Sequence, residues 1–184
     1  MNDDMNISMA RVPYMPQEMI DWLGSHLTKD MRVFEWGSGG STLFIAPRVK
    51  SIITIESSKR WYIKVLLSVI FNLVFNCRLK LILPEPASRQ SKQTEPYRSS
   101  GKYGHLTYKK YVEAIDSYPD VYFDLIIVDG RCRTQCLLHA RTKVKRGGSI
   151  LLDDADRPHY VDSINALTDF TKHPINRGLI LKRL

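Results

Sequence analysis

Acidic side chains stand at the ends of four apolar runs, and they are the residues of this sequence best placed for chemistry. They are Glu35 in MRVFEW, Glu56 in SIITIE, Asp129 in FDLIIVDG, and the pair Asp153-Asp154 in SILLDD. One acid at the end of a strand is common, because Asp and Glu cap helices. Four such acids at a shared sheet edge indicate a ligand that carries hydroxyl groups or positive charge.

A glycine-rich loop, GSGGST, follows the first of these acids and runs from Gly37 to Thr42. Such a loop lets backbone N–H groups approach a ligand at the start of a helix. Glu56 comes about twenty residues after the glycines, where a carboxylate can accept both hydrogen bonds of a ribose diol. The combination predicts a nucleoside ligand. A tight turn followed by a capping glutamate is the alternative interpretation.

The elements that must position these residues alternate along the chain. Strand-like runs cover 31–36, 51–56, 78–83, 123–130, 149–154 and 178–183. Helical patterns begin at Pro16 and Pro158 and cover 41–47, 57–75, 108–115 and 132–142. This alternation predicts an α/β fold of three layers, with helices on both faces of a mostly parallel, twisted sheet. Ligands in such folds bind beyond the carboxyl ends of the strands, where the strand order reverses.

The chain is long enough for one domain, and we expect a single domain over residues 1–184. Residues 1–13 are expected to form a loose arm, and residues 84–104 a long basic loop that could act as a substrate lid. The apolar run 63–75 is shorter than the roughly 17–25 residues that span a bilayer. It predicts a buried helix, which could cover the sheet or face another subunit.

Four segments in order resemble the motifs of class I S-adenosylmethionine-dependent methyltransferases. They are VFEWGSGGST, ITIESSKRWY, FDLIIVDGRCRTQC and KRGGSILLDDADRPHY, and the likeness covers roughly residues 16–172. The order and spacing of the four are more specific than any one of them. The resemblance implies the Rossmann-like methyltransferase fold, with S-adenosylmethionine as the cofactor.

The resemblance also implies roles for individual residues. Glu35 and the backbone of Gly37–Gly39 would hold the methionine part of the cofactor, and Glu56 its ribose hydroxyls. Asp129, the catalytic candidate, would lie near the methionine amine or the transferred methyl group. The implied cofactor-binding set is Glu35, Gly37, Ser38, Gly39, Ser41, Thr42, Glu56, Ser57, Trp61, Asp129 and Gly130. Trp61 could equally belong to the core.

Two departures from the family pattern matter. Ser41 replaces the usual third glycine of the loop. Only GLILKRL remains for the last strands, so the sheet could be shortened at its C-terminal strands and the substrate wall left incomplete.

The candidate substrate-binding residues are Arg131, Arg133 and Asp154. Both arginines follow Asp129 closely, and the guanidinium fork suits a carboxylate or phosphate. The expected acceptor is therefore a small molecule or sugar that can be anionic, and the methylated atom stays open. Asp129, Asp154 and His159 are the candidate bases.

A magnesium site at Asp129, Asp153 and Asp154, as in catechol-type methyltransferases, is an alternative. We favour the interpretation in which Asp153 and Asp154 cap a turn and pair with Arg157 or Arg131, and we predict no metal.

Composition narrows the partners. The net charge is +8, which would permit a nucleic acid partner. However, no RNA-binding motif appears, and acids such as Glu85 and Glu95 partly balance the charge of the basic loop. Nucleic acid is therefore not the expected partner. The acid-free stretch from Arg131 to Arg146 is expected to end in a solvated basic helix terminus. Oligomeric state is left open.

The three cysteines fit neither a disulfide framework nor a zinc site, and Cys132 and Cys136 are expected to pack on one helix face. With no signal peptide or membrane span in the pattern, a cytoplasmic protein is expected. Two other functions stay open: a non-catalytic binding protein, suggested by the short C-terminus, and an NAD-binding oxidoreductase. The latter is disfavoured because Thr42 occupies the last glycine position of the dinucleotide motif.

Overall fold

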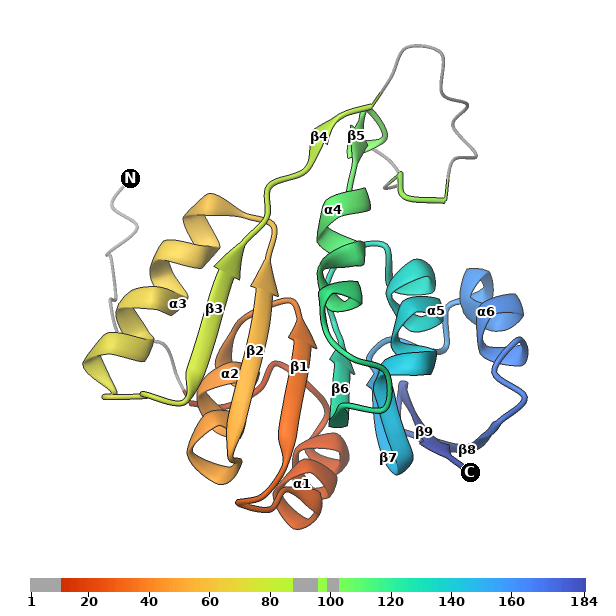
Figure 1. Cartoon of the computed structure of the whole chain (residues 1–184), viewed down its shortest axis with the longest axis horizontal. Helices are drawn as coiled ribbons and strands as arrows, with labels where there is room; N and C mark the ends of the chain where they lie inside the picture. Colours follow the sequence, from red (N-terminus) through yellow and green to blue (C-terminus); the bar gives the residue numbers. More distant parts are fainter. Residues whose placement is uncertain (1–10, 88–95, 99–102) are drawn as a thin grey trace.

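The computed structural model describes residues 11–87, 96–98 and 103–184 (Figure 1). Its main sheet has seven strands in the order β3-β2-β1-β6-β7-β9-β8. All neighbouring pairs from β3 to β7 are parallel, and β9 runs antiparallel to both β7 and β8. The strands are β1 (Arg32–Trp36), β2 (Ser51–Glu56), β3 (Cys77–Leu81), β6 (Phe123–Val128), β7 (Val144–Leu152), β8 (Phe170–Ile175) and β9 (Gly178–Arg183).

Helices cover both faces of this sheet, as the alternation in the sequence predicts. They are α1 (Gln17–His26), α2 (Gly40–Ile45), α3 (Lys59–Phe71), α4 (Lys109–Val112), α5 (Arg133–Lys143) and α6 (Val161–Asn165), with short 3-10 turns at Ala46–Arg48, Glu113–Ser117 and Pro158–Tyr160. Successive residues of β1 serve opposite faces. Val33 packs in the cluster with Met19 and Leu23 of α1, whereas Phe34 packs in the cluster with Leu137 of α5.

The C-terminal part of the sheet is not shortened, so the expected loss of strands is wrong. GLILKR forms β9 as predicted. The sequence pattern missed β8, whose segment FTKHPI follows the helix that was predicted to begin at Pro158. Four successive residues of β8 are exposed, and Pro174 lies within it. An edge strand needs neither apolar alternation nor every backbone N–H, so its sequence carries little strand signal.

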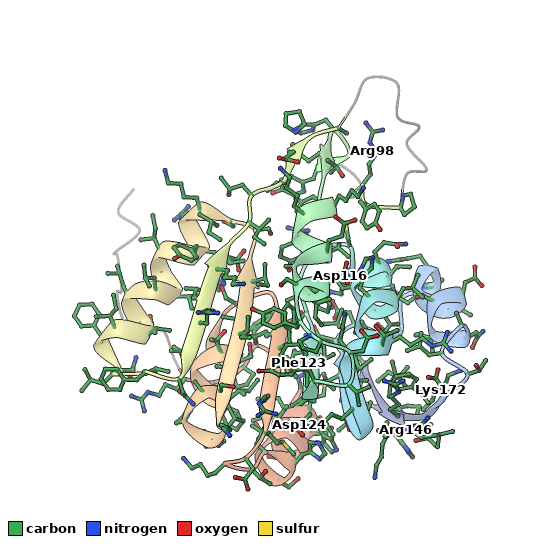
Figure 2. The ribbon with its side chains drawn as sticks, in the orientation of Figure 1. Arg98, Asp116, Phe123, Asp124, Arg146 and Lys172 are labelled. Atoms are coloured by element: carbon green, nitrogen blue, oxygen red, sulfur yellow. The ribbon has the colours of Figure 1, made fainter. Side chains whose placement is uncertain are left out.

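The segment 84–104 is not wholly a loop. Glu85–Pro86 (β4) pairs with Leu106–Thr107 (β5) in a two-stranded sheet, and Arg98 makes a β-bridge to Thr107. This small sheet projects beyond the carboxyl ends of the main strands and carries Arg98, whereas Asp124 lies towards their amino ends (Figure 2). The expected lid falls mostly on residues 88–95 and 99–102, and the expected arm on residues 1–10; both lie outside the described residues.

The expectation of a buried helix over 63–75 is also wrong. Helix α3 ends at Phe71 because Asn72 leaves the helix and Leu73 takes a left-handed conformation with φ of 51°. Only Val65, Ser68 and Val69 of α3 are buried, while the Phe75 side chain beyond it is 89% exposed. One face of the helix covers the sheet, and the opposite apolar face meets solvent.

Cys132 and Cys136 do not share a helix face as expected. Cys136 is fully buried within α5 beside Ala140, but Cys132 precedes the helix in a left-handed conformation. All three cysteines are free thiols. No helix of the described part is long and apolar enough to cross a membrane.

Candidate functional site

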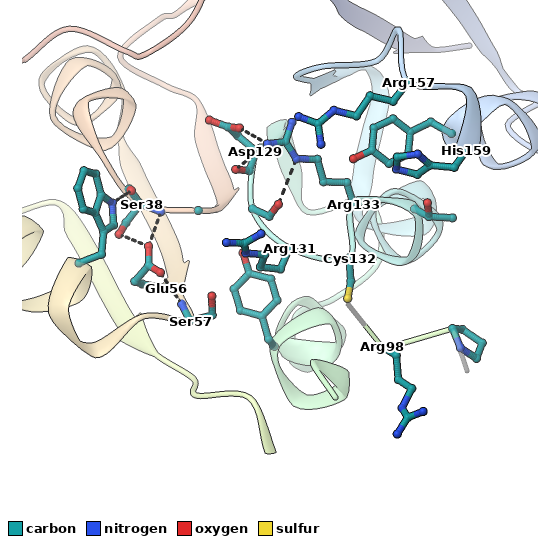
Figure 3. Close-up of a pocket in the computed structure, with 17 residues that line it drawn as sticks. Ser38, Glu56, Ser57, Arg98, Asp129, Arg131, Cys132, Arg133, Arg157 and His159 are labelled. Atoms are coloured by element: carbon teal, nitrogen blue, oxygen red, sulfur yellow. Dashed lines mark hydrogen bonds and ion pairs between the residues drawn. The ribbon is translucent and has the colours of Figure 1, made fainter. Parts of the chain in front are cut away.

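A pocket lies where the strand order reverses between β1 and β6, at the carboxyl ends of β1, β2 and β6 (Figure 3). Its volume is about 530 Å³. One side is lined by Gly37, Ser38, Glu56, Ser57, Trp61, Tyr111, Asp129 and Gly130. The other side is lined by Pro96, Arg98, Arg131, Cys132, Arg133, Thr134, Arg157, His159 and Tyr160. Acids face one half of the pocket, and guanidinium groups the other.

Glu56 ends β2 and is held by four donors of the protein. Its Oε2 accepts hydrogen bonds from the N–H and the hydroxyl of Ser38, at 3.2 and 2.8 Å. Its Oε1 accepts from the N–H groups of Ser57 and Ser58, at 2.7 and 2.8 Å. Donors to both oxygens fix the carboxylate in one position. Glu56 therefore presents an oriented carboxylate to the pocket, as its place after β2 predicts.

The glycine loop does not offer its first amides to a ligand, which corrects the expectation from the sequence. The N–H of Gly37 donates to Ile55 O at 3.0 Å, that of Ser38 to Glu56, and that of Gly39 to Thr42 Oγ1 at 3.0 Å. Gly37 is required for a different reason: its φ is +91°, and a Cβ there would lie 2.8 Å from Asp129 O. Gly37 has no room for a Cβ because the loop after β1 contacts the loop after β6.

Glu35, Ser41 and Thr42 lie behind the pocket wall and do not line it. The hydroxyls of Ser41 and Thr42 each donate to a different oxygen of Glu35, both at 2.5 Å. Burial raises the pKa of Glu35 to about 7, although these hydrogen bonds oppose the shift. The geometry therefore favours a supporting role, in which Glu35 fastens α2 to β1, over the direct ligand contact predicted for these three residues. Gly39 does not line the pocket either.

Trp61 is not a core residue. Its side chain lies in the first turn of α3, is 40% exposed and lines the pocket. The indole N–H donates to the carbonyl of Ser38, which holds the ring against the glycine loop. Of the two interpretations of Trp61, the pocket position is the one that the structure shows.

Asp129 and Gly130 follow β6 and line the same side of the pocket as the glycine loop. A Cβ on Gly130 would lie 1.9 Å from the Tyr111 hydroxyl and 3.1 Å from the Gly37 nitrogen, so no other residue fits without rearrangement. Tyr111 is a pocket residue that the sequence did not reveal, because its helical spacing only indicated a core position. Burial raises the pKa of Asp129 well above its usual value, with the Arg133 guanidinium opposing and the Asp153 carboxylate adding to the shift.

Arg133 lines the pocket, and its guanidinium is held by groups of the protein itself. It donates to Asp129 Oδ1 at 2.7 Å and to Asp153 O at 2.6 Å, and it lies 3.4 Å from carboxylate oxygens of both Asp153 and Asp154. Its side chain is 12% exposed. Arg133 thus ties the loop after β6 to the loop after β7.

Asp154 likewise pairs within the protein rather than presenting a free carboxylate. It contacts Arg133, Arg157 and Arg177, the last at 3.0 Å. The pairing with Arg157 was predicted, but Arg177 was not, because it comes from the turn between β8 and β9. Among the described residues, no group of three or more His, Cys, Asp or Glu side chains is arranged to hold a metal ion.

The basic half of the pocket keeps Arg131 as a candidate substrate residue. Its guanidinium lies 5.0 Å from the centre of the Tyr103 ring, a cation–π contact that leaves the fork edge available for hydrogen bonding. Arg98 of the expected lid, Arg157 and the candidate base His159 line the same half. Such a wall suits a carboxylate or phosphate group.

Tyr97 fastens the segment that brings Pro96 and Arg98 to the pocket. A hydrogen bond of 3.2 Å joins its hydroxyl to His139 Nε2, and His139 Nδ1 lies 2.9 Å from Asp116 Oδ2. The Asp116 carboxylate selects the tautomer with the proton on Nδ1, so Nε2 accepts from Tyr97. The Tyr97 carbonyl accepts from Tyr108 N at 2.8 Å and from the Cys132 thiol at 3.4 Å.

Comparison with known proteins gives a match in structure only. No family model matches the chain, and no curated protein matches it in sequence. A methyltransferase-like protein from Silicibacter pomeroyi has a TM-score of 0.70 and 19% identity, over 96% of this chain and 90% of that one. An rRNA methylase from Streptococcus thermophilus has a TM-score of 0.60 and 16% identity, over 94% and 99%.

A Streptococcus mutans protein that was solved in complex with SAH has a TM-score of 0.61 and 14% identity. The match covers 94% of this chain and 100% of that one. Identities this low establish the fold and leave the activity to the site itself. The chain has the fold of the class I S-adenosylmethionine-dependent methyltransferases, as its four motifs predict.

Proposed function

We propose that this protein transfers a methyl group from S-adenosylmethionine to an anionic small molecule or sugar. The observation that carries the proposal is the fixed Glu56 carboxylate in the pocket wall at the β1–β6 reversal. A carboxylate at that place suits a ribose diol. We place the protein in the cytoplasm, since its cysteines are all free thiols.

The residues present fit this cofactor. Glu56 would accept the ribose hydroxyls, Trp61 and Ser57 would border the nucleoside, and the Asp129 carboxylate would face a cationic group. When bound, S-adenosylmethionine supplies an electrophilic methyl group on a sulfonium. The chain would hold the acceptor in line with that methyl group.

Asp129 is the candidate base. In this role one of its carboxylate oxygens would take the proton from an acceptor hydroxyl, while the Arg133 guanidinium holds Oδ1 at 2.7 Å. Arg131, with Arg157 and His159 beside it, would orient the anionic group of the acceptor. Glu56 and Asp129 thus serve the cofactor half of the pocket, and the guanidinium groups serve the acceptor half.

The dinucleotide alternative fits this geometry poorly. A pyrophosphate needs backbone N–H groups at the start of a long helix. Here the first three loop amides donate within the protein, and α2 has only 6 residues. The non-catalytic alternative was suggested by a shortened sheet. Strands β8 and β9 complete the sheet, so this argument no longer supports it.

Calorimetric titration with S-adenosylhomocysteine (SAH) tests the cofactor site. We expect native protein to bind SAH, and Glu56→Gln and Glu56→Ala to lose at least about tenfold in affinity, because the ribose hydroxyls lose a charged acceptor. Glu18→Ala is the matched control, since Glu18 is exposed on α1. No binding by folded native protein would contradict the proposal, and preferential binding of NADH would favour the oxidoreductase.

Transfer of labelled methyl groups to a panel of acceptors tests the part of the proposal that concerns the acceptor. Anionic small molecules and sugars should be labelled, and RNA should not. Arg131→Met should raise KM for the acceptor at least about tenfold without changing SAH affinity, because only the acceptor loses a guanidinium partner. Arg60→Met, an exposed arginine on α3, is its control. SAH binding without any turnover would favour the non-catalytic alternative.

A further inference from the structure

Helix α3 carries an exposed apolar surface that the proposed function does not use. This α3 apolar face consists of Ile63, Leu67, Ile70 and Phe71 on the helix and Leu73 and Phe75 just after it. The side chains are between 36% and 89% exposed. The four helical residues are spaced by four, three and one, so they lie on one side of the helix, opposite buried Val65 and Val69.

We propose that the α3 apolar face is the interface of a homodimer in which two α3 helices pack antiparallel about a two-fold axis. Contiguous apolar patches of this kind mark interaction sites in soluble proteins. Figure 1 shows α3 at the outer edge of the molecule, beside the edge strand β3. A second copy can therefore approach without meeting the α5 and α6 side.

The size of the surface fits a second copy. A standard-size two-fold interface buries roughly 800 Å² on each chain, and this patch supplies six large, exposed apolar side chains to it. A two-fold interface uses the same patch on both partners, and this patch is long enough to contact itself. It needs no second surface of different chemistry.

Charge also favours the antiparallel arrangement. The first residues of α3 are basic, Lys59, Arg60 and Lys64, and its first turn holds no acid and its last turn no base. Cations are favourable near a helix C-terminus and unfavourable near an N-terminus. Antiparallel pairing brings the basic start of each α3 next to the C-terminus of its partner, which a single chain cannot do for itself.

The pairing also predicts which residues meet. With Leu67 near the axis, Ile63 of one copy faces Phe71 of the other, because the two positions are equally distant from Leu67 in sequence. Trp61, which lines the pocket, precedes Ile63 of this seam by two residues. The interface therefore borders the cofactor half of the pocket, while the proposal stands independently of the activity.

Analytical ultracentrifugation over a wide concentration range tests the proposal. Native protein should sediment as a dimer, and Ile70→Glu should sediment as a monomer with an unchanged melting temperature, since Ile70 is already 57% exposed. Burying the new carboxylate in the seam should weaken association at least about a hundredfold. Val161→Glu is the control, because Val161 is 51% exposed on α6 at the other side of the sheet.

Cysteine cross-linking tests the geometry. Oxidation of Leu67→Cys should give a covalent dimer faster than Ile63→Cys, Phe71→Cys or the control Val161→Cys, because a residue near a two-fold axis faces its own copy. A monomeric native protein at every concentration would overturn the proposal, as would a dimer that survives Ile70→Glu. Dimerisation only of a chain lacking residues 1–10 would assign the face to that segment and also overturn it.

Discussion

Two strand-end acids of similar sequence context, Glu35 and Glu56, have opposite surroundings. Glu56 accepts from four donors and lines the pocket, whereas Glu35 is sealed behind the glycine loop with two hydroxyl donors. Burial without a cationic partner disfavours a charged carboxylate, so the pKa of Glu35 is raised to about 7. The same residue type thus lines the pocket in one place and fastens the loop in the other.

Glu35 should make the stability of the protein depend on pH. Since its folded-state pKa of about 7 exceeds the ordinary 4.5, its contribution is fully present below the ordinary value and is lost as the pH rises through about 7. The difference corresponds to about 3 kcal/mol. Urea unfolding at pH 5 and pH 8 should show that native protein loses stability relative to Glu35→Gln, whose amide cannot ionise. Parallel pH profiles for the two proteins would contradict this assignment.

Gly130 is predicted to be the least replaceable glycine of the site. A methyl group there overlaps the Tyr111 hydroxyl, so Gly130→Ala should cost about 1–3 kcal/mol in the free energy of unfolding. Gly39→Ala is the control, because the nearest atoms to its Cβ belong to Trp61 at 3.9 Å and its φ of 174° suits any residue. Tyr111→Phe in the Gly130→Ala background should restore part of the loss. Equal costs for the two alanine variants would show that the overlap is not what matters.

At the scale of elements, the acceptor half of the pocket is assembled from segments far apart in sequence. Arg133 at the start of α5 joins the loops after β6 and β7, and Arg177 adds the turn between β8 and β9. The hydrogen-bonded set Asp116, His139 and Tyr97 fastens the segment with Pro96 and Arg98. These few side-chain contacts therefore determine how rigid this wall of the pocket is.

Removing the imidazole of that set should loosen the wall and expose Cys132, whose thiol contacts the Tyr97 carbonyl. Burial raises the pKa of Cys132 to about 11, so its alkylation by iodoacetamide should be slow in native protein and several times faster in His139→Ala. His173→Ala, at an exposed histidine on β8, should leave the rate unchanged. Peptide mapping separates Cys132 from fully buried Cys136. An unchanged Cys132 rate in His139→Ala would mean that Tyr97 is held without the histidine.

At the scale of the whole molecule, the net charge is +8, and several basic side chains of the described residues are paired with acids. In the stretch expected to form a basic helix terminus, Arg141, Lys143 and Lys145 pair with Asp169, Asp120 and Asp124 at 2.9, 2.8 and 2.6 Å. Asp124 lies towards the end of the sheet away from Arg98 (Figure 2). The basic groups of the pocket itself are set in a hollow, which suits a small anion better than a nucleic acid strand.

RNA binding should therefore be weak, and its affinity should fall steeply as the salt concentration rises. Fluorescence anisotropy with a labelled oligonucleotide should give a dissociation constant above about 1 µM at physiological salt, with at least a tenfold loss between about 50 and 200 mM salt. SAH affinity should change little over the same range, because Glu56 is buried. Submicromolar RNA binding that persists at high salt, together with methylation of the RNA, would replace the small-molecule acceptor with an RNA.

Much of the fold was predictable because strand and helix periods are local. The runs SIITIE and GLILKR have the bounds of β2 and β9, and Glu56, Ser57, Gly37 and Asp129 reach the pocket because parallel strands end at one edge. The sequence alone thus determined the α/β class, the strand-end position of the site and the glycines of the loop.

Tertiary structure decided what local patterns do not encode. Edge strand β8 lacks an apolar alternation, so only its pairing with β9 reveals it. The face of α3 that meets solvent is as apolar as the face that meets the sheet, so periodicity could not tell them apart. The pairing of Asp153 with arginine depended on Arg133 and Arg177, which lie 20 and 24 residues away in the sequence. Such contacts are set by the packing of loops against one another, a property of the whole fold and not of any single segment.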